Sequence, residues 1–569
     1  MGSAYVPPPN RPPPSAAPPR GAPPPRGLPP HASEASRLLC AGTYLDAGFR
    51  DKVIDELYRM EHRVVAPSLG FDAARVLAHA LQARRMELFW SWCVLMLLLL
   101  GVVASGWWLV ALVVPGLLLS FARRMRGTAA DPPGRRRTFA FWLRWAGRLL
   151  LAYLLIATLY VGFGAADKGP FEPPPGADEL SVPQAWLALA SLLLMAVCVV
   201  RQQARYVEVL RGPLSPEHFP DAEIDPAEWA AEPRLRALKD RIRREQHAPL
   251  VMYHEAHPFC GAGVAHDTWV LAVELRPDPA RERRPIGNGD VLASVRPFLE
   301  QLREVAEVSE REGQVVRDRL RQLRIDECVF LPAEGLDHRD DAPYDQRSFE
   351  LHRAHAVEEG GEKRRHFLRI GVAGWEEELV VTVFVRVHTQ GQMLMLEVAP
   401  HVLFPVRADF KDAHHEAYTF AHQNAFGKAV HIVTRMAGAP GEALVALGRR
   451  AVHAWRRMTG EFARGLPEGP AVSVRELAAE PAGSLFQSMD VDRYLKGVQD
   501  RIAYGVRAAL AEAGYRTDEF AQKVVHISNG GVYIDSVAGS TFAVGGSARA
   551  TTTSGGQPPP WRGPAPHGQ

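Results

Sequence analysis

The chain is poor in cysteine and lacks the common catalytic motifs. Its 569 residues hold five cysteines without a CxxC pair, and the odd count argues against a disulfide framework and fits a reducing compartment. No GxxxxGK[ST] phosphate loop and no GxSxG nucleophile elbow occurs. Their absence argues against a P-loop nucleotide hydrolase and against an α/β-hydrolase. The formal net charge is only +2, so nucleic acid is not an expected partner. No cofactor is implied.

Acidic residues, lysine and histidine are also missing from three long apolar runs. These runs extend over residues 89–121, 141–165 and 185–200. The first is too long for one span of about 20 residues, and Gly101 to Gly106 divides it, which indicates a helical hairpin. We therefore predict four transmembrane spans in two hairpins, at 88–104, 106–121, 148–165 and 184–200. Their lack of intramembrane charge argues against an ion-coupled transporter.

Basic and acidic residues are unevenly distributed around these runs. Arg84 and Arg85 precede the first hairpin, and several arginines follow it between residues 123 and 148. The loop over 165–183 instead carries four acids and one lysine. Because basic loops stay in the cytoplasm, we expect a multi-pass protein of a bacterial plasma membrane with both termini cytoplasmic. The lipid bilayer is thus the first expected partner.

The remaining chain divides by composition. Residues 1–33 and 553–569 are rich in Pro or Gly and are expected to be disordered. Cytosolic helices are predicted over 34–87, the second beginning near Asp72, and a polar connector over 202–247. Residues 248–407 predict an α+β domain with a mainly antiparallel sheet, including a strand over 249–257 and a hairpin at Thr389–Gly391. A helical section (408–525) and a Gly-rich β ending (526–552) follow.

One group of residues has the ligand types of a zinc site. The candidates are His254, His257, Cys260 and His266, around the glycine turn Gly261–Gly263. Their spacing matches no standard zinc finger, and a strand would turn His254 and His257 to opposite faces. We therefore predict no metal site and keep the four residues only as candidates. A second histidine group (His414, His415, His422 and His431) more often belongs to a solvated helix than to a pH-sensing patch.

The segment over 442–464 has the strongest helical pattern outside the apolar runs. An apolar stripe lies opposite an arginine-rich face, which is typical of a helix on an anionic membrane surface. The alternative is an ordinary helix packed on the domain. The stripe consists of Leu444, Leu447, Ala451, Trp455, Met458 and Phe462, and the basic residues are Arg449, Arg450, Arg456, Arg457 and Arg464.

Several motifs resemble those of a family of uncharacterised actinobacterial multi-pass membrane proteins. The segment YHEAHPFCGAGVAHDTWVLAVEL is similar to the family pattern Y-S-G-x-x-P-F-V-G-A-G-x-x-x-x-S-W-S-F-A. Further similarity lies at Trp375–Arg386, at Ser473–Ala478 and in ISNGGVY…GSTFAVGGSARA. The resemblance covers roughly residues 85 to 550 and implies a membrane block with a cytosolic domain. It brings no activity, ligand or catalytic residue, and His254 and His257 depart from the pattern.

Three functions remain open. The first is a non-enzymatic membrane scaffold or sensor, with a conflict-related role as one form, whose cytosolic domain binds a ligand or a protein partner. Its Gly-rich ending would serve assembly, including assembly into a homo-oligomer. The second is a membrane-anchored, metal-dependent enzyme centred on His254 to His266. The third is an oligomeric channel or transporter. We predict the first, because no catalytic constellation is assembled in the sequence.

Overall fold

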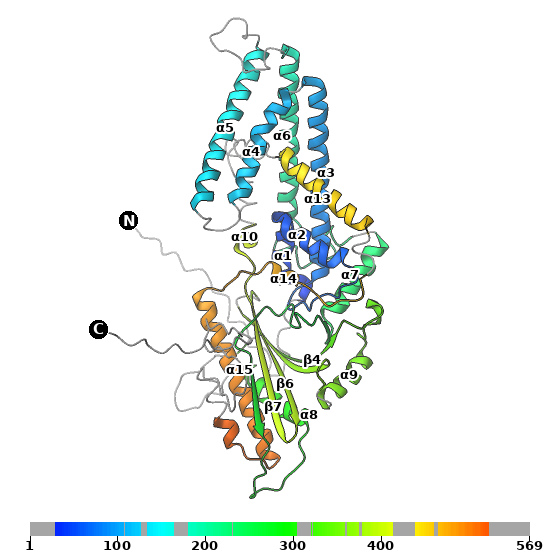
Figure 1. Ribbon diagram of the computed structural model, residues 1–569, viewed down its shortest axis with the longest axis vertical. Coiled ribbons are helices and arrows are strands. Elements are labelled where there is room, and N and C mark those ends of the chain that lie inside the picture. Colours follow the sequence, from blue (N-terminus) through cyan, green and yellow to red (C-terminus); the bar gives the residue numbers. More distant parts are fainter. Residues whose placement is uncertain are drawn as a thin grey trace, which may run out of the picture.

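The computed structural model describes residues 29–106, 108–126, 134–163, 180–229, 232–303, 320, 322–358, 361–374, 378–413, 439–459 and 465–522. Long helices form one end of an elongated molecule, and a sheet with its covering helices forms the other (Figure 1). The predicted Gly-rich ending, the C-terminal tail and nearly all of the Pro-rich tail lie outside the described residues. So do His414, His415, His422 and His431.

The N-terminal helices pack around the base of the longest helix. They are α1 (Glu34–Leu45), α2 (Ala47–Ile54) and the π-helical turn η2 (Asp55–Arg59), and they share one apolar core with α3 (Ala73–Ser105) and α7 (Pro233–Gln246). Helices were predicted for this part of the chain, and the structure confirms them. This core fixes the direction in which α3 leaves the hydrophilic half of the molecule.

Helix α3 is continuous from this core into the apolar run. Asp72 caps it by accepting a hydrogen bond of 2.9 Å from the Ala74 N–H, so the predicted start near Asp72 is confirmed. Its 33 residues correspond to a rod of about 50 Å. It ends at Ser105, where Gly106 adopts a φ of 70°. The predicted break between Gly101 and Gly106 is therefore confirmed.

Three further long helices complete the bundle. They are α4 (Trp108–Arg126), α5 (Gly134–Gly162) and α6 (Val182–Arg211). Helix α3 packs along α6, and α4 along α5. Three of the described helices (α3, α5 from Arg137, and α6) are long and apolar enough to cross a membrane, while the apolar part of α4, Trp108–Leu119, is shorter. Both α5 and α6 extend well beyond the predicted spans.

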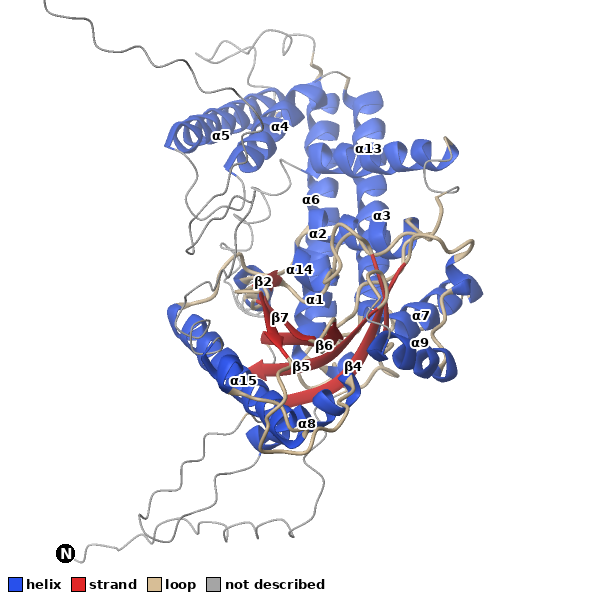
Figure 2. Ribbon diagram, turned by 60° about the horizontal axis from the view of Figure 1, so that its bottom comes forward, coloured by secondary structure: helices blue, strands red, loops and turns tan. Residues whose placement is uncertain are grey.

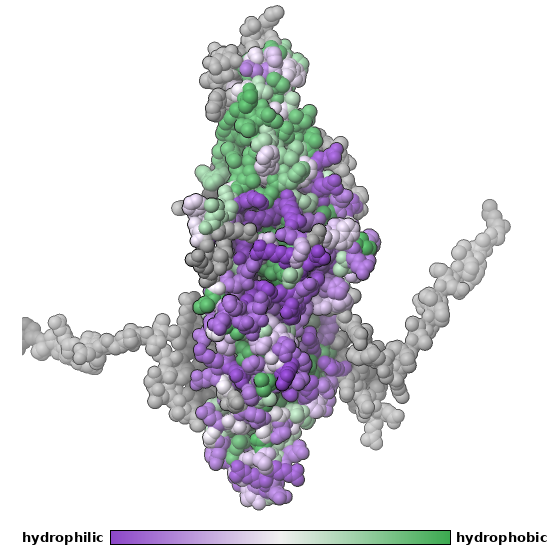
Figure 3. All heavy atoms as spheres, turned by 90° about the vertical axis from the view of Figure 1, so that its right-hand side faces the viewer, coloured by the Kyte–Doolittle hydropathy of each residue, from purple (hydrophilic) through white to green (hydrophobic). Residues whose placement is uncertain are grey.

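The surface of this bundle is hydrophobic. Figure 3 shows apolar residues gathered over one end of the molecule and polar residues over most of the rest. Water would disfavour such a large contiguous patch, which is typical of a surface that faces lipid or a protein partner. Among the large exposed side chains are Phe89, Trp92, Leu100, Val103, Trp142, Leu149, Ile156, Leu193 and Leu194.

A seven-stranded mixed sheet forms the other half. Its strand order is β1-β4-β5-β6-β7, with β2 and β3 both pairing β7. β1 runs parallel to β4, and the remaining pairs are antiparallel. The strands are β1 (Leu250–Tyr253), β2 (Val264–Ala265), β3 (Trp269–Glu274), β4 (Leu323–Pro332), β5 (Arg365–Gly374), β6 (Leu379–Gln390) and β7 (Met393–Leu403).

Two helices cover one face of this sheet. They are α8 (Asn288–Glu300) and α15 (Leu485–Glu512), and they lie side by side along the strands (Figure 2). Val498 and Ile502 of α15 share a core with strands β3 to β7. The predicted boundary at residue 407 thus divides residues that pack in one core. On the opposite face, Phe259 packs against rings of β4, β5 and β6.

Local differences from the sequence predictions have simple causes. The strand predicted over 249–257 ends at Tyr253, because the His257 N–H closes a turn onto the His254 carbonyl at 2.9 Å. The β6–β7 hairpin is confirmed, but its turn is Gly391–Gln392, both at positive φ. Helix α9 (Gln346–Glu358) was not predicted, since only Phe349 and Ala356 of its side chains are buried.

Candidate functional site

The glycine turn between β1 and β2 joins the helical half to the sheet. Gly261 and Gly263 have φ values of 98° and 96°, which strain any other residue. A Cβ on Gly261 would lie 2.5 Å from the Pro67 carbonyl oxygen, six residues before α3 begins. A Cβ on Gly263 would lie 2.2 Å from the Val402 carbonyl oxygen of β7. The turn therefore requires glycine at both positions, and it touches both halves of the molecule.

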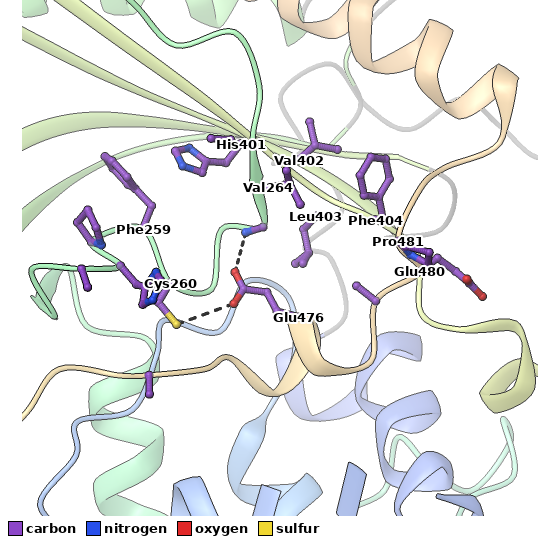
Figure 4. A pocket seen from close by; sticks show the side chains of 17 residues that line it. Phe259, Cys260, Val264, His401, Val402, Leu403, Phe404, Glu476, Glu480 and Pro481 are labelled. Atoms are coloured by element: carbon purple, nitrogen blue, oxygen red, sulfur yellow. Dashed lines mark hydrogen bonds between the residues drawn. The ribbon is translucent and has the colours of Figure 1, made fainter. Parts of the chain in front are cut away.

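A carboxylate holds this turn. Glu476 lies on the short helix α14 (Val474–Leu477), and its Oε1 accepts hydrogen bonds from Gly261 N at 2.8 Å and Gly263 N at 2.9 Å. Among the described residues, its Oε2 has only a long contact of 3.8 Å from the Cys260 thiol. Figure 4 shows the carboxylate directed at Cys260 and at the backbone before Val264. Within the part of the chain that the structure describes, Oε2 of Glu476 thus retains spare capacity to accept hydrogen bonds.

A cavity of about 490 Å³ opens beside this carboxylate. This volume falls in the range of small-molecule sites. The walls come from the turn, the end of β7 and the segment after residue 470 (Figure 4). The lining residues are Ala256, His257, Pro258, Phe259, Cys260, Gly263, Val264, Ala265, His401, Val402, Leu403, Phe404, Ala471, Glu476, Ala479, Glu480 and Pro481.

His401 is a buried polar residue of the cavity wall. Its ring is buried and packs against Phe259 with 4.6 Å between ring centroids. Burial lowers the pKa of His401, so the ring is neutral near pH 7. Its Nδ1 lies 3.2 Å from the Ala399 carbonyl oxygen, which can only accept, so Nδ1 carries the proton. Nε2 is then a hydrogen-bond acceptor.

The environment of Cys260 disfavours the reactive thiolate form. Burial, and then the nearby Glu476 carboxylate, raise the pKa of its thiol well above the ordinary value. A thiolate is the form that attacks electrophiles or binds metals, so Cys260 is poorly suited to either task near neutral pH. We therefore assign it no catalytic role.

The four metal-ligand candidates are not assembled around one point. The rings of His254 and His257 lie 6.5 Å apart, and His254 Nε2 lies 3.8 Å from Glu334. Cys260 faces Glu476, while His266 Nε2 lies 3.7 Å from Asp492 on α15. Among the residues that the structure describes, no group of three or more potential ligands is placed to hold a metal ion. No mechanistic step is therefore assigned to a metal.

The predicted membrane-surface segment is helix α13 (Ala439–Met458), which crosses α3 and α6 (Figure 2). Its buried side, with Ala443 and Ala446, packs toward α3 and α4. Apolar side chains remain exposed along the helix: Leu444 is 55% exposed, Trp455 68% and Met458 83%. Leu447 is half-buried, and Ala451 is exposed.

Arginines of α13 have two different environments. Arg449, predicted on the polar face, instead docks onto the protein: it lies 2.9 Å from Asp51 and 3.4 Å from Glu87. The His453 Nδ1 likewise lies 2.7 Å from Arg59. Arg450 and Arg456 are exposed. The Arg457 side chain, Phe462 and Arg464 lie outside the described part of the chain.

Sequence patterns found the glycine turn and α13, but not Glu476 or His401. Glu476 is more than 200 residues away from the turn that it holds, and His401 sits within an apolar strand. The one available signal was the resemblance at Ser473–Ala478, which includes Glu476. Nothing local showed that this segment meets the turn.

Comparison with known proteins finds a similarity to one protein family over part of the chain. No curated protein matches the chain, and no solved structure matches it. A family model does match, beginning just before β3 and extending past α15, so it includes His401 and Glu476 while the glycine turn precedes it. The family model is that of the AbeC-like domain, and residues 268–542 of this chain are similar to it.

Proposed function

We propose that the protein is an integral membrane protein with four spans, α3 to α6, and a sheet domain in the bacterial cytoplasm. The observation that carries this proposal is the continuity of α3 from the apolar core of the hydrophilic half into the bundle with the hydrophobic surface. Helix α4 serves as the fourth span, since it turns back from Gly106 and packs along α5. The arginines that flank α3 and α6 favour a cytoplasmic position for both termini.

Reporter fusions test this topology. Fusions at Ala129 and Gly287 are expected to report a cytoplasmic position, and a fusion at Gly176 an external position, because basic loops are retained inside. Paired reporters, one active only outside and one only inside, provide the control at each site. An external signal at Gly287 would contradict the scheme, because the whole sheet domain would then lie on the other side.

We further propose that α13 lies on the inner leaflet and contacts anionic lipids. Arg449 ties it to Glu87, two residues before the apolar run begins at Phe89, so α13 sits at the level of the membrane boundary. Its exposed Leu444, Trp455 and Met458 would enter the interface, and Arg450 and Arg456 would meet lipid phosphates. This arrangement gives the exposed apolar side chains a place out of water.

Amide hydrogen exchange tests the position of α13. In lipid nanodiscs rich in phosphatidylglycerol, residues 444–458 are expected to exchange more slowly than in zwitterionic nanodiscs, by about fivefold for each arginine that meets the surface. The double variant Arg450→Glu/Arg456→Glu should abolish the difference. Helix α15, on the distant sheet, provides the internal control and should not respond. Equal exchange of 444–458 in the two lipids would refute the lipid contact.

The cytosolic domain is proposed to bind a ligand and to act as a non-enzymatic sensor or scaffold. The cavity at Glu476 supports this, because it is large enough for a small molecule and its thiol is protonated. Its wall includes the turn that touches Pro67, six residues before α3 begins at Ala73. A ligand there would contact the same element that joins the sheet to the membrane helices.

A further inference from the structure

We propose that the Glu476 cavity binds an organic ammonium ion with an apolar body. The inference rests on the proposed ligand-binding function, and it names the chemical class of the ligand. It is independent of the membrane topology, so either can fail without the other.

The charge of the cavity points to a cation. Its ionisable lining groups are two carboxylates, two imidazoles and one thiol, and no lysine or arginine lines it. Within the described residues, neither Glu476 nor Glu480 forms an ion pair; Glu476 contacts two N–H groups and a thiol, and Glu480 accepts one N–H from Ala408. A half-buried carboxylate without a counter-charge favours a bound cation.

The hydrogen-bonding groups of the cavity wall favour a ligand that donates hydrogen bonds. Glu476 Oε2 has spare acceptor capacity, and His401 Nε2 is a neutral acceptor without a partner among the described residues. An ammonium group carries up to three N–H donors and no acceptor, so it suits such a wall. A carboxylate or phosphate ligand would meet repulsion from Glu476 and Glu480.

The rest of the wall indicates an apolar body. Most lining residues are apolar, and the rings of Phe259 and Phe404 flank the space (Figure 4). Burying apolar surface against them contributes about 25 cal/mol per Å². An aromatic face next to an ammonium group also contributes a cation–π attraction. A bare metal ion cannot bury apolar surface against these side chains. An arylalkylamine can bury its ring there and also place its ammonium group near the carboxylates.

Three probes with the same phenylethyl body and different head groups test the proposal. The detergent-solubilised full chain is titrated by calorimetry with 2-phenylethylammonium, the neutral 2-phenylethanol and the anionic 3-phenylpropionate. The ammonium is expected to bind at least about tenfold more tightly than the alcohol, since one charge-assisted contact contributes about 1.4 kcal/mol or more. The carboxylate is expected to bind most weakly. Equal or tighter binding of the carboxylate, or no binding of the ammonium, would overturn the proposal.

The variant Glu476→Gln removes the carboxylate charge but keeps the shape of the side chain, so it tests the effect of the charge on binding without disturbing the fold. Its amide oxygen can still accept from Gly261 and Gly263, so the turn should be retained. Ammonium affinity should fall about tenfold or more while alcohol affinity stays within about twofold. Glu334→Gln, outside the cavity, is the matched control and should bind like the wild type. An unchanged ammonium affinity in Glu476→Gln, with an unchanged melting curve, would show that Glu476 does not hold the ligand.

Discussion

Replacing Arg75 by methionine is expected to destabilise the protein by about 3–5 kcal/mol, because a buried carboxylate would lose a permanently charged, hydrogen-bonded partner. Arg75 and Asp225 are both fully buried, and the Arg75 guanidinium lies 2.9 Å from Asp225 Oδ2. It also donates to the Phe219 carbonyl at 2.8 Å and stacks on the Phe219 ring at 3.7 Å. Methionine can fill the space but supplies neither charge nor donors.

The protonation of Asp225 provides a second readout of this substitution. Burial alone would raise the pKa of Asp225, but hydrogen bonds from His79, Ala227 and Arg75, with the charge of His79, lower it to about 2. A depressed pKa contributes stability above the unfolded value of about 3.9, and that stability is lost as the pH falls toward 2. Without Arg75 the pKa should rise, so acid unfolding should begin at higher pH.

Thermal and acid unfolding of the detergent-solubilised protein measure both effects. Arg276→Met is the control, because the ion pair of Arg276 with Glu274 is exposed and such pairs contribute little to stability. A melting temperature and an acid midpoint that match those of Arg276→Met would mean that the Arg75–Asp225 pair does not stabilise the base of α3.

The variant Gly263→Ala is expected to cost about 3 kcal/mol or more and to disrupt the cavity. Alanine is strained at a φ of 96°, and its Cβ would meet the Val402 carbonyl oxygen at 2.2 Å. The clash is with backbone that β6 and β2 both pair, so it cannot be relieved by rotating a side chain. Thermal unfolding and binding of 2-phenylethylammonium measure the two consequences.

The variant Gly335→Ala separates the two causes of destabilisation, which are backbone strain at positive φ and the clash of an added Cβ. Gly335 has a φ of 105° but no atom within 4 Å of an added Cβ, so its substitution carries only the conformational cost of about 1–3 kcal/mol. Gly263→Ala should be clearly less stable than Gly335→Ala. Equal destabilisation by the two variants would show that β7 yields to the added methyl group.

The helical half of the protein was largely predictable because its signals are local. Asp72 caps α3 through a contact two residues away, and Gly106 ends it through its own backbone conformation. Length and hydropathy identify α3, α5 and α6 as helices able to cross a membrane. For α4, the apolar part alone does not reach that length. Its packing along α5 supports the proposal that it spans as well.

The exposed stripe of α13 was also visible in the sequence, but its docking was not. Periodicity groups Leu444, Trp455 and Met458, which are all exposed. Periodicity also places Arg449 on the polar face, whereas the structure pairs it with Asp51 and Glu87. Whether a charged residue faces water or a carboxylate of another helix depends on packing that no local pattern contains.

The sequence by itself determined the apolar helices, most strands of the sheet and the glycine turn, since hydropathy, alternation and backbone preference act over a few residues. It did not determine the parallel pairing of β1 with β4 or the sharing of one core by α15 and the strands. Only the tertiary structure brings Glu476 to Gly261 and His401 to Phe259. These contacts decide the charge and the hydrogen-bonding capacity of the cavity, and they join segments too far apart in the chain for any local preference to specify.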